Sequence, residues 1–208
     1  MLRLRTLGAV TLDRDGAPLT GRSTQRKRLA LLAVLAAARD HAVRRDTMLA
    51  LLWPERGAEA ARHALSQTLY ALRQDLGHDA ILAGLDDLRL NDAVTSDVGD
   101  FQRALDEGDP ERGIALYGGP FLDGFFVADA PEFERWAEQE RQRLARAHGA
   151  ALERLADAAT ARGDHARAVE LLRRRAAADA LNGHVALKLM QALVGAREQE
   201  PASRGPGV

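Results

Sequence analysis

The chain has 208 residues, no cysteine and a net charge of −1. Its length allows two ordinary domains, each able to bury a core. The lack of cysteine excludes a disulfide framework and thiolate metal sites, which fits a reducing cytoplasm. The longest strongly apolar run, residues 29–38, is too short to span a bilayer, and no charged-then-apolar leader opens the chain. We therefore expect a soluble, cytoplasmic protein.

Short apolar runs open the chain, at residues 2–7 and 10–12, and the turn Asp15-Gly16 follows. Both runs predict strands. Residues 24–38 begin with a basic cluster and continue almost entirely apolar, which predicts a helix buried on all sides. A short helix is expected over residues 46–53, with Asp46 as its N-cap and Pro54 as its stop.

The segment 61–77 predicts a helix with two different faces. Its leucines recur at spacings of four, three and four, so they form a buried seam of Leu65, Leu69, Leu72 and Leu76. The opposite face has hydrogen-bonding side chains and no acid: His63, Gln67, Tyr70 and Gln74. Such a face suits a helix in a DNA major groove, although an ordinary amphipathic surface helix has the same seam. Gly77 supplies the C-terminal stop.

Residues 81–90, ILAGLDDLRL, contain two apolar runs around a turn rich in Gly and Asp, which predicts a hairpin. The resulting order is strands, three helices and a hairpin, as in a winged helix-turn-helix. The expected tip carries Asp86 and Asp87, and Arg89 is the only cation in the hairpin. This charge argues against strong contact between the wing and phosphate.

The second half predicts helices throughout, at 97–105, 111–117, 133–162, 165–178 and 184–194, with Asp97 as the first cap. Short turns containing Gly and Asp, with small residues at the seams, indicate helical hairpins stacked like tetratricopeptide repeats. The loop 118–131 is rich in Phe. An exposed partner-binding patch is one interpretation, but we favour gap filling, with Phe121 and Phe125 in the core. Residues 196–208 are rich in Pro and Gly and predict a disordered tail.

Several motifs in order resemble a known family. QRKRLALLAVLA, LLWPE and ARHALSQTLYALRQDLG resemble the response-regulator-type winged helix of Streptomyces antibiotic regulatory proteins (SARPs). ALYGGPFLDGF (115–125), PEFERW (131–136), Arg141 and Leu144 resemble the bacterial transcriptional activator domain that accompanies it. The resemblance runs from residue 2 to about 194. It implies a transcriptional regulator, usually an activator, whose third helix enters the major groove while the wing approaches the minor groove.

The resulting expectation is a mainly α protein. An N-terminal winged helix-turn-helix (α+β), residues 1–95, is followed by an all-α tetratricopeptide-like helical domain, residues 96–195, and by the tail. The last predicted helix lacks a packing partner, so that edge is either frayed or completed by another subunit. Residues 1–93 carry three more basic than acidic side chains and residues 94–208 four more acidic than basic, which agrees weakly with DNA contact by the first half.

Two sets of DNA-contacting residues are predicted. Base contacts are assigned to the outward face of the 61–77 helix, namely His63, Ser66, Gln67, Tyr70 and Gln74. Phosphate contacts are assigned to nearby cations, namely Lys27, Arg44, Arg45, Arg62, Arg73 and Arg89. Arg62 and Arg73 lie nearer the leucine seam, so an internal ion pair is an equal alternative for both. The expected partners are double-stranded DNA, RNA polymerase and a second copy on DNA, with no membrane.

The residues that common enzyme motifs require are absent from the sequence at the necessary spacing. Neither lysine follows a glycine, so no Walker loop for phosphate exists. The six histidines show no zinc-ligand spacing on a helix face, and the four serines lie in no GxSxG motif. We therefore expect no enzyme, no cofactor and no metal. The alternative to a DNA-binding activator is a tetratricopeptide-like interaction or sensory adaptor with weak or lost DNA binding.

Overall fold

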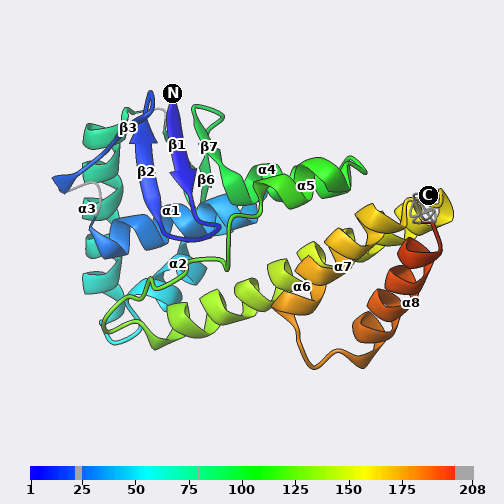
Figure 1. The fold of residues 1–208 in the computed structure, drawn as a ribbon. Coiled ribbons are helices and arrows are strands. Elements are labelled where there is room, and N and C mark those ends of the chain that lie inside the picture. Colours follow the sequence, from blue (N-terminus) through cyan, green and yellow to red (C-terminus); the bar gives the residue numbers. More distant parts are fainter. Residues whose placement is uncertain (22–24, 79, 200–208) are drawn as a thin grey trace, which may run out of the picture.

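The computed structural model describes residues 1–21, 25–78 and 80–199 (Figure 1). Thr24, where the first helix was expected to begin, lies outside these residues. The N-terminal sheet has the order β3-β2-β1-β7. The hairpin strands β1 (Leu2–Arg5) and β2 (Thr11–Arg14) were predicted. The strands β3 (Ala17–Pro18) and β7 (Val94–Ser96) were not predicted. Strand β7 pairs in parallel with β1, although almost half of the sequence separates the two strands.

A second sheet forms the wing, in the order β4-β6-β5. Strands β5 (Ile81–Ala83) and β6 (Asp87–Leu90) form the predicted hairpin, with Ile81 opposite Leu90 and Ala83 opposite Leu88. The unpredicted strand β4 (Val43–Arg44) pairs with β6. The winged-helix order of elements expected from the sequence is confirmed.

Three helices complete the winged-helix half. Helix α1 (Arg26–Ala38) buries residues 29–36 without interruption, as its apolar sequence predicted. Helix α2 (Arg45–Leu52) begins after Arg44, so the prediction of Asp46 as its N-cap was wrong, and Asp46 lies in the first turn. Helix α3 (Ala58–Leu76) begins three residues earlier than expected and ends at Gly77, whose φ of 102° suits glycine.

The second half contains α4 (Asp97–Asp106), α5 (Pro110–Leu116), α6 (Pro131–Ala161), α7 (His165–Ala178) and α8 (Gly183–Gln199). Ser96 rather than Asp97 caps α4, by accepting a hydrogen bond from Gly99 N at 3.1 Å. Helix α8 continues to Gln199, so the first residues of the expected tail, 196–199, are helical. Residues 200–208 lie outside the described residues. No helix among the described residues is long and apolar enough to cross a membrane.

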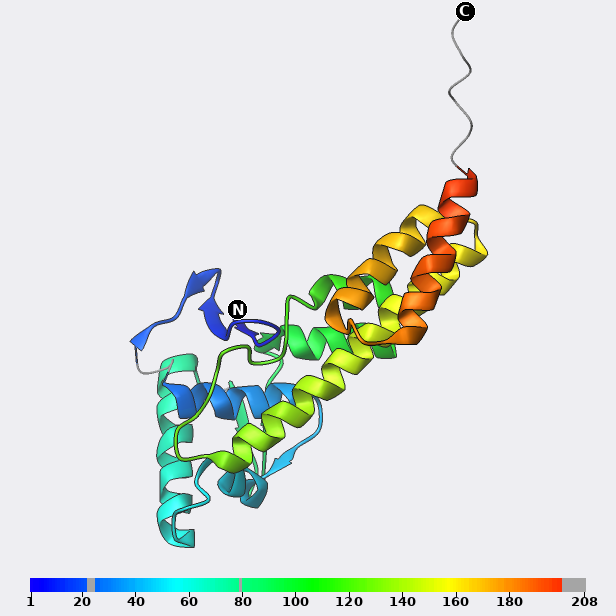
Figure 2. The same ribbon diagram turned by 60° about the horizontal axis from the view of Figure 1, so that its bottom comes forward.

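One continuous core joins the two halves of the chain. A single buried cluster extends from Leu2 to Leu144 and includes Phe133 and Ala137 of α6. A second cluster joins the distal part of α6 to α5, α7 and α8. Helix α6 therefore has one end beside α2 and the other in the helical stack (Figures 1 and 2). The boundary expected at residue 95 divides the sequence but does not divide the core.

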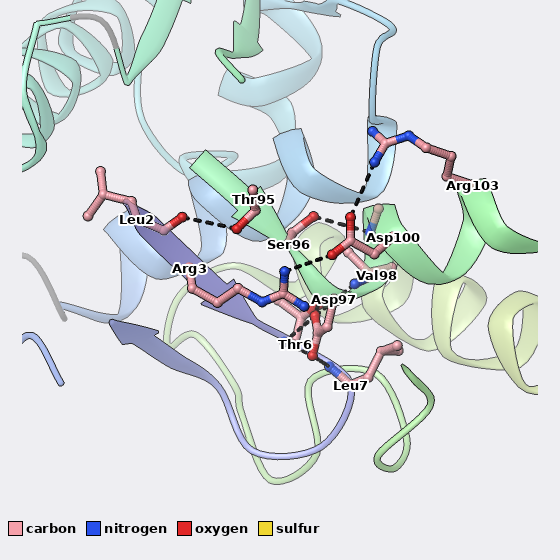
Figure 3. Close-up of polar contacts among 11 residues, drawn as sticks. Leu2, Arg3, Thr6, Leu7, Thr95, Ser96, Asp97, Val98, Asp100 and Arg103 are labelled. Atoms are coloured by element: carbon pink, nitrogen blue, oxygen red, sulfur yellow. Dashed lines mark hydrogen bonds and ion pairs between the residues drawn. The ribbon is translucent and has the colours of Figure 1, made fainter. Parts of the chain in front are cut away.

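The buried carboxylate of Asp97 connects β1 with the start of α4 (Figure 3). It accepts hydrogen bonds from the backbone N–H groups of Thr6, at 2.8 and 2.9 Å, and of Leu7, at 2.9 Å. The Thr6 hydroxyl at 2.9 Å and the Val98 N–H at 2.7 Å complete its partners. This requirement for a buried acceptor explains why Asp97 is not the cap that local sequence predicted.

The Phe-rich loop adds a second connection to the same segment. Leu122 N donates to the Thr6 carbonyl at 2.8 Å, and Gly8 N donates to the Pro120 carbonyl at 3.0 Å. The side chain of Phe121 is fully buried and that of Phe125 is partly buried, which agrees with the gap-filling interpretation. Phe126 was not assigned to the core, and it is 57% exposed.

Candidate nucleic-acid interface

The two faces of α3 are separated as the sequence predicted. The leucine seam is buried, together with Ala61 and Ala64. All five predicted base-contacting side chains are exposed, namely His63, Ser66, Gln67, Tyr70 and Gln74. Tyr70 is a large side chain and is still 67% exposed. The amide nitrogen of Gln67 lies 2.8 Å from His63 Nε2, so these two side chains form one hydrogen-bonded unit.

The extended start of α3 changes the charge of this face. Glu59 lies one turn before His63 and is exposed. The shorter predicted helix implied an outward face without acidic side chains, but the observed helix has Glu59 on that face. A carboxylate can accept a hydrogen bond from cytosine N4 in a major groove, so Glu59 is a further candidate for base contact.

The predicted phosphate contacts divide into free and engaged cations. Arg44 and Arg62 are exposed, and neither forms an ion pair within the described part of the chain. Arg45 instead donates from Nε and Nη2 to the Gly84 carbonyl, at 3.3 and 3.2 Å. Its backbone N–H also donates to the Asp86 carbonyl at 2.8 Å. Arg45 therefore holds the turn of the wing in place.

Arg73 and Arg89 come together beside the wing. Both line a surface hollow of about 550 Å³, which His78 also lines. Arg73 donates to the Ile81 carbonyl at 3.3 Å, and its buried Nε lacks a hydrogen-bond partner among the described residues. The alternative of an internal ion pair is not seen for Arg73 or Arg62 within the described residues. The carboxylate of Asp75, in the last turn of α3, forms an ion pair with Arg28 at 3.0 Å.

Lys27 is only partly accessible. Its ammonium lies over the ring of Trp53, 5.8 Å from the centroid. Burial lowers the pKa of Lys27, and the charge of Arg56 lowers it further, whereas Asp129 opposes the shift. A phosphate at this position would compete with an aromatic contact that already exists.

Two cations near Lys27, Arg26 and Arg56, were not among the predicted site residues. Arg56 lies exposed in the turn between α2 and α3. The guanidinium of Arg26 lies 4.7 Å from the ring centroid of Phe126, and Arg26 Nη1 donates to the Phe126 carbonyl at 2.9 Å. The signal for Arg56 was its position as a basic residue in the turn directly before α3. The contact of Arg26 is non-local and had no signal in the sequence.

The wing presents few features for phosphate binding. Leu85 at its tip is 95% exposed, and the neighbouring Asp86 and Asp87 are also exposed. Gly84 N donates to the Asp87 carbonyl at 3.0 Å and closes the turn. The acidic tip expected from the sequence is therefore solvent-facing. Among the described residues, no group of three or more His, Asp or Glu side chains is placed to hold a metal ion.

Comparisons with known proteins identify the family of this chain and a solved structure with a similar fold. The family model described as bacterial transcriptional activator domain matches residues 85–204, more than half of the chain. No curated protein matches the chain. The structure solved as "Mycobacterium tuberculosis EmbR in complex with low affinity phosphopeptide" has a similar fold, with a TM-score of 0.68 and 24% sequence identity.

That likeness covers 95% of this chain and 56% of the EmbR chain, so this chain spans little more than half of EmbR. It extends over both the winged helix and the helical half, which confirms the predicted fold class. The chain belongs to the bacterial transcriptional activator domain family, which agrees with the resemblance of its motifs to SARP-type transcriptional regulators.

Proposed function

We propose that this regulator binds DNA in a sequence-specific manner and acts as an activator, with α3 in the major groove. The observation that carries the proposal is the outward face of α3. It exposes five hydrogen-bonding side chains while the opposite face is buried in the core. A rigid helix with a polar, uncovered face is the structure with which winged-helix proteins read base edges.

Phosphate contacts would come from both sides of α3. Arg44 lies in β4, Arg62 lies in α3, and both are exposed without an ion pair among the described residues. Arg73 and Arg89 line the hollow beside the wing. Such contacts fix the position of a protein on the duplex but carry no base preference. In this assignment residues 1–95 bind DNA, and residues 96–195 contact proteins, among them RNA polymerase.

A single winged helix reads too few base pairs to select one site in a genome. We therefore propose that two copies bind DNA together, at two spaced half-sites. Footprinting on DNA with one and with two half-sites tests this proposal. Equal affinity for the two DNAs would contradict it.

An interaction adaptor with weak DNA binding is the second candidate. The observation that favours it is the acidic, solvent-facing tip of the wing at Asp86 and Asp87. Like charges there would repel phosphate. The stacked helices α6, α7 and α8 would then be the functional part.

Selection from a random duplex library, followed by salt titrations, separates the two candidates. Gln67→Ala should reduce discrimination between the selected and random DNA by about 1–3 kcal/mol and should leave random-sequence binding unchanged. Arg62→Ala should weaken binding to both DNAs and lower the salt slope by about one. Arg173→Ala is the matched control, because this arginine is also exposed but lies on α7.

Failure of the selection to enrich any sequence would contradict specific reading by α3. Weak binding to all duplexes, unchanged by Arg62→Ala, would favour the adaptor. If the selection enriches a sequence and Gln67→Ala still discriminates between selected and random DNA like the parent protein, Gln67 does not contact the bases.

A further inference from the structure

The last helix, α8, has apolar side chains on two opposite faces. It lies at the end of the helical half that is away from the two sheets (Figures 1 and 2). One face packs on α7 and buries Val185 and Ala192. The other face exposes Leu187 by 50%, Met190 by 57% and Val194 by 56%. A helix that is apolar on both sides is normally covered on both sides, so the exposed face is a candidate interface.

The exposed face of α8 is a regular seam without charge. Its residues, Gly183, Leu187, Met190 and Val194, follow one another at spacings of four, three and four, by which two helices pack side by side. The ammonium group of Lys188 is directed to α6 instead, where it lies 2.8 Å from the carboxylate of Asp157. The seam can therefore pack against a copy of itself without bringing like charges together.

The sizes of the side chains along the seam suit two helices that run in opposite directions. With a two-fold axis between Leu187 and Met190, Leu187 of each copy faces Met190 of the other. Val194 of each copy then faces Gly183 of the other. Gly183 is exposed, and a Cβ at its position would have no atom within 4 Å, so there is room for the larger Val194.

The charges at the ends of the seam favour the same direction. Arg197 follows Val194 by one turn, is exposed and forms no ion pair among the described residues. In an antiparallel pair it lies at the start of the other copy's α8, next to Asp179. That carboxylate is exposed, and its contact with Arg175 in its own chain is long, at 3.4 Å. A parallel pair would place the two Arg197 side chains side by side, where their charges repel.

We propose that the exposed face of α8 binds a second copy of this chain, as an antiparallel, two-fold symmetric helix pair. Leu187, Met190 and Val194 of both copies become buried, and Arg197 pairs with Asp179 at each end. A single helix pair is smaller than a standard interface, which buries about 800 Å² per partner, so we expect a dissociation constant on the order of 10 μM. This pair forms without DNA, so the outcome of the DNA-binding experiments does not affect it.

Analytical ultracentrifugation of the full chain without DNA, from about 1 to about 300 μM, tests whether a second copy binds. The parent chain should change from monomer to dimer across this range. Met190→Glu should stay monomeric, because the two-fold axis brings the two new carboxylates close together. Leu85→Glu is the matched control, because Leu85 is also exposed but lies on the wing, and this variant should dimerise like the parent chain. A parent chain that stays monomeric would overturn the proposal and leave this face to a different partner, and so would a dimeric Met190→Glu.

Disulfide cross-linking tests the direction of the two helices, in a chain that has no cysteine of its own. Gly183→Cys and Val194→Cys are prepared separately, mixed and oxidised, and the linked peptides are identified by mass spectrometry. Both positions are exposed, so both variants should fold. The antiparallel pair predicts disulfides that join one variant to the other, because only these two positions face each other within disulfide distance. Disulfides that join each variant only to itself would overturn the proposal.

Discussion

Replacing Asp97 with Asn should lower the free energy of unfolding by about 2–4 kcal/mol. The amide keeps one oxygen but points its NH₂ group at an N–H donor, so either Leu7 N, which donates to Oδ2, or Val98 N, which donates to Oδ1, loses its acceptor in a buried site. An unsatisfied buried donor costs about 1–3 kcal/mol, and a hydrogen bond to a charged group contributes about 1.5–3 kcal/mol. Urea denaturation followed by circular dichroism measures the change. The melting temperature should fall by about 4–16 °C for a protein of this size.

Asp92→Asn supplies the control for the same chemical change at an exposed site, and it should alter the unfolding free energy by less than about 0.5 kcal/mol. A loss below about 0.5 kcal/mol in Asp97→Asn would refute the reasoning. It would mean that the segment at Thr6 and Leu7 is held by the neighbouring Phe-rich loop alone.

Three further changes test the packing. Leu72→Ala, in the fully buried seam of α3, should cost about 2–5 kcal/mol in urea denaturation, and a cost below about 1 kcal/mol would place this leucine outside the core. Gly149→Ala should cost about 1–2 kcal/mol, because its Cβ would lie 2.8 Å from Nε of Arg175, which pairs with Glu153; a neutral result would show that Arg175 moves freely. Burial, then the charges of Arg174 and Arg175, lower the pKa of His148 to about 4, so the unfolded chain binds a proton between pH 6.5 and 4 that the folded chain does not. The free energy of unfolding should therefore decrease as the pH is lowered from 6.5 to 4. His148→Phe should make this decrease smaller by about 1–2 kcal/mol, a value discounted for partial solvent exposure. The same pH dependence of stability in His148→Phe and the parent protein would contradict the pKa shift.

Periodic segments were predictable because their signal is local. The uninterrupted apolar run of α1 and the leucine spacing of α3 each specify a helix and its buried side. The exposure of the candidate base-contacting residues follows from the same spacing. Helices α6 and α7 were also placed within two residues of their observed bounds, since Pro, Gly and Asp mark their ends.

Features that depend on distant partners were missed. Strands β4 and β7 have two and three residues, too few to show alternation, and each exists because a remote strand pairs with it. The hydrogen bonds from Arg45 to Gly84 and the position of Lys27 over Trp53 arise in the same way. Local chemistry therefore identified the cations near α3 but could not tell which of them were already engaged.

Helix α6 has a mechanical consequence for any DNA-bound form of the protein. From Leu144 to its end at Ala161 the helix extends about 25 Å beyond the shared core, at about 1.5 Å per residue. Because its first part is built into that core, the helix acts as a rigid arm and not as a tether. A partner held at the far end would keep a fixed rotational phase about the DNA axis. Inserting about 5 base pairs, half of a helical turn, between the binding site and the promoter should then abolish activation, and inserting about 10 should restore it.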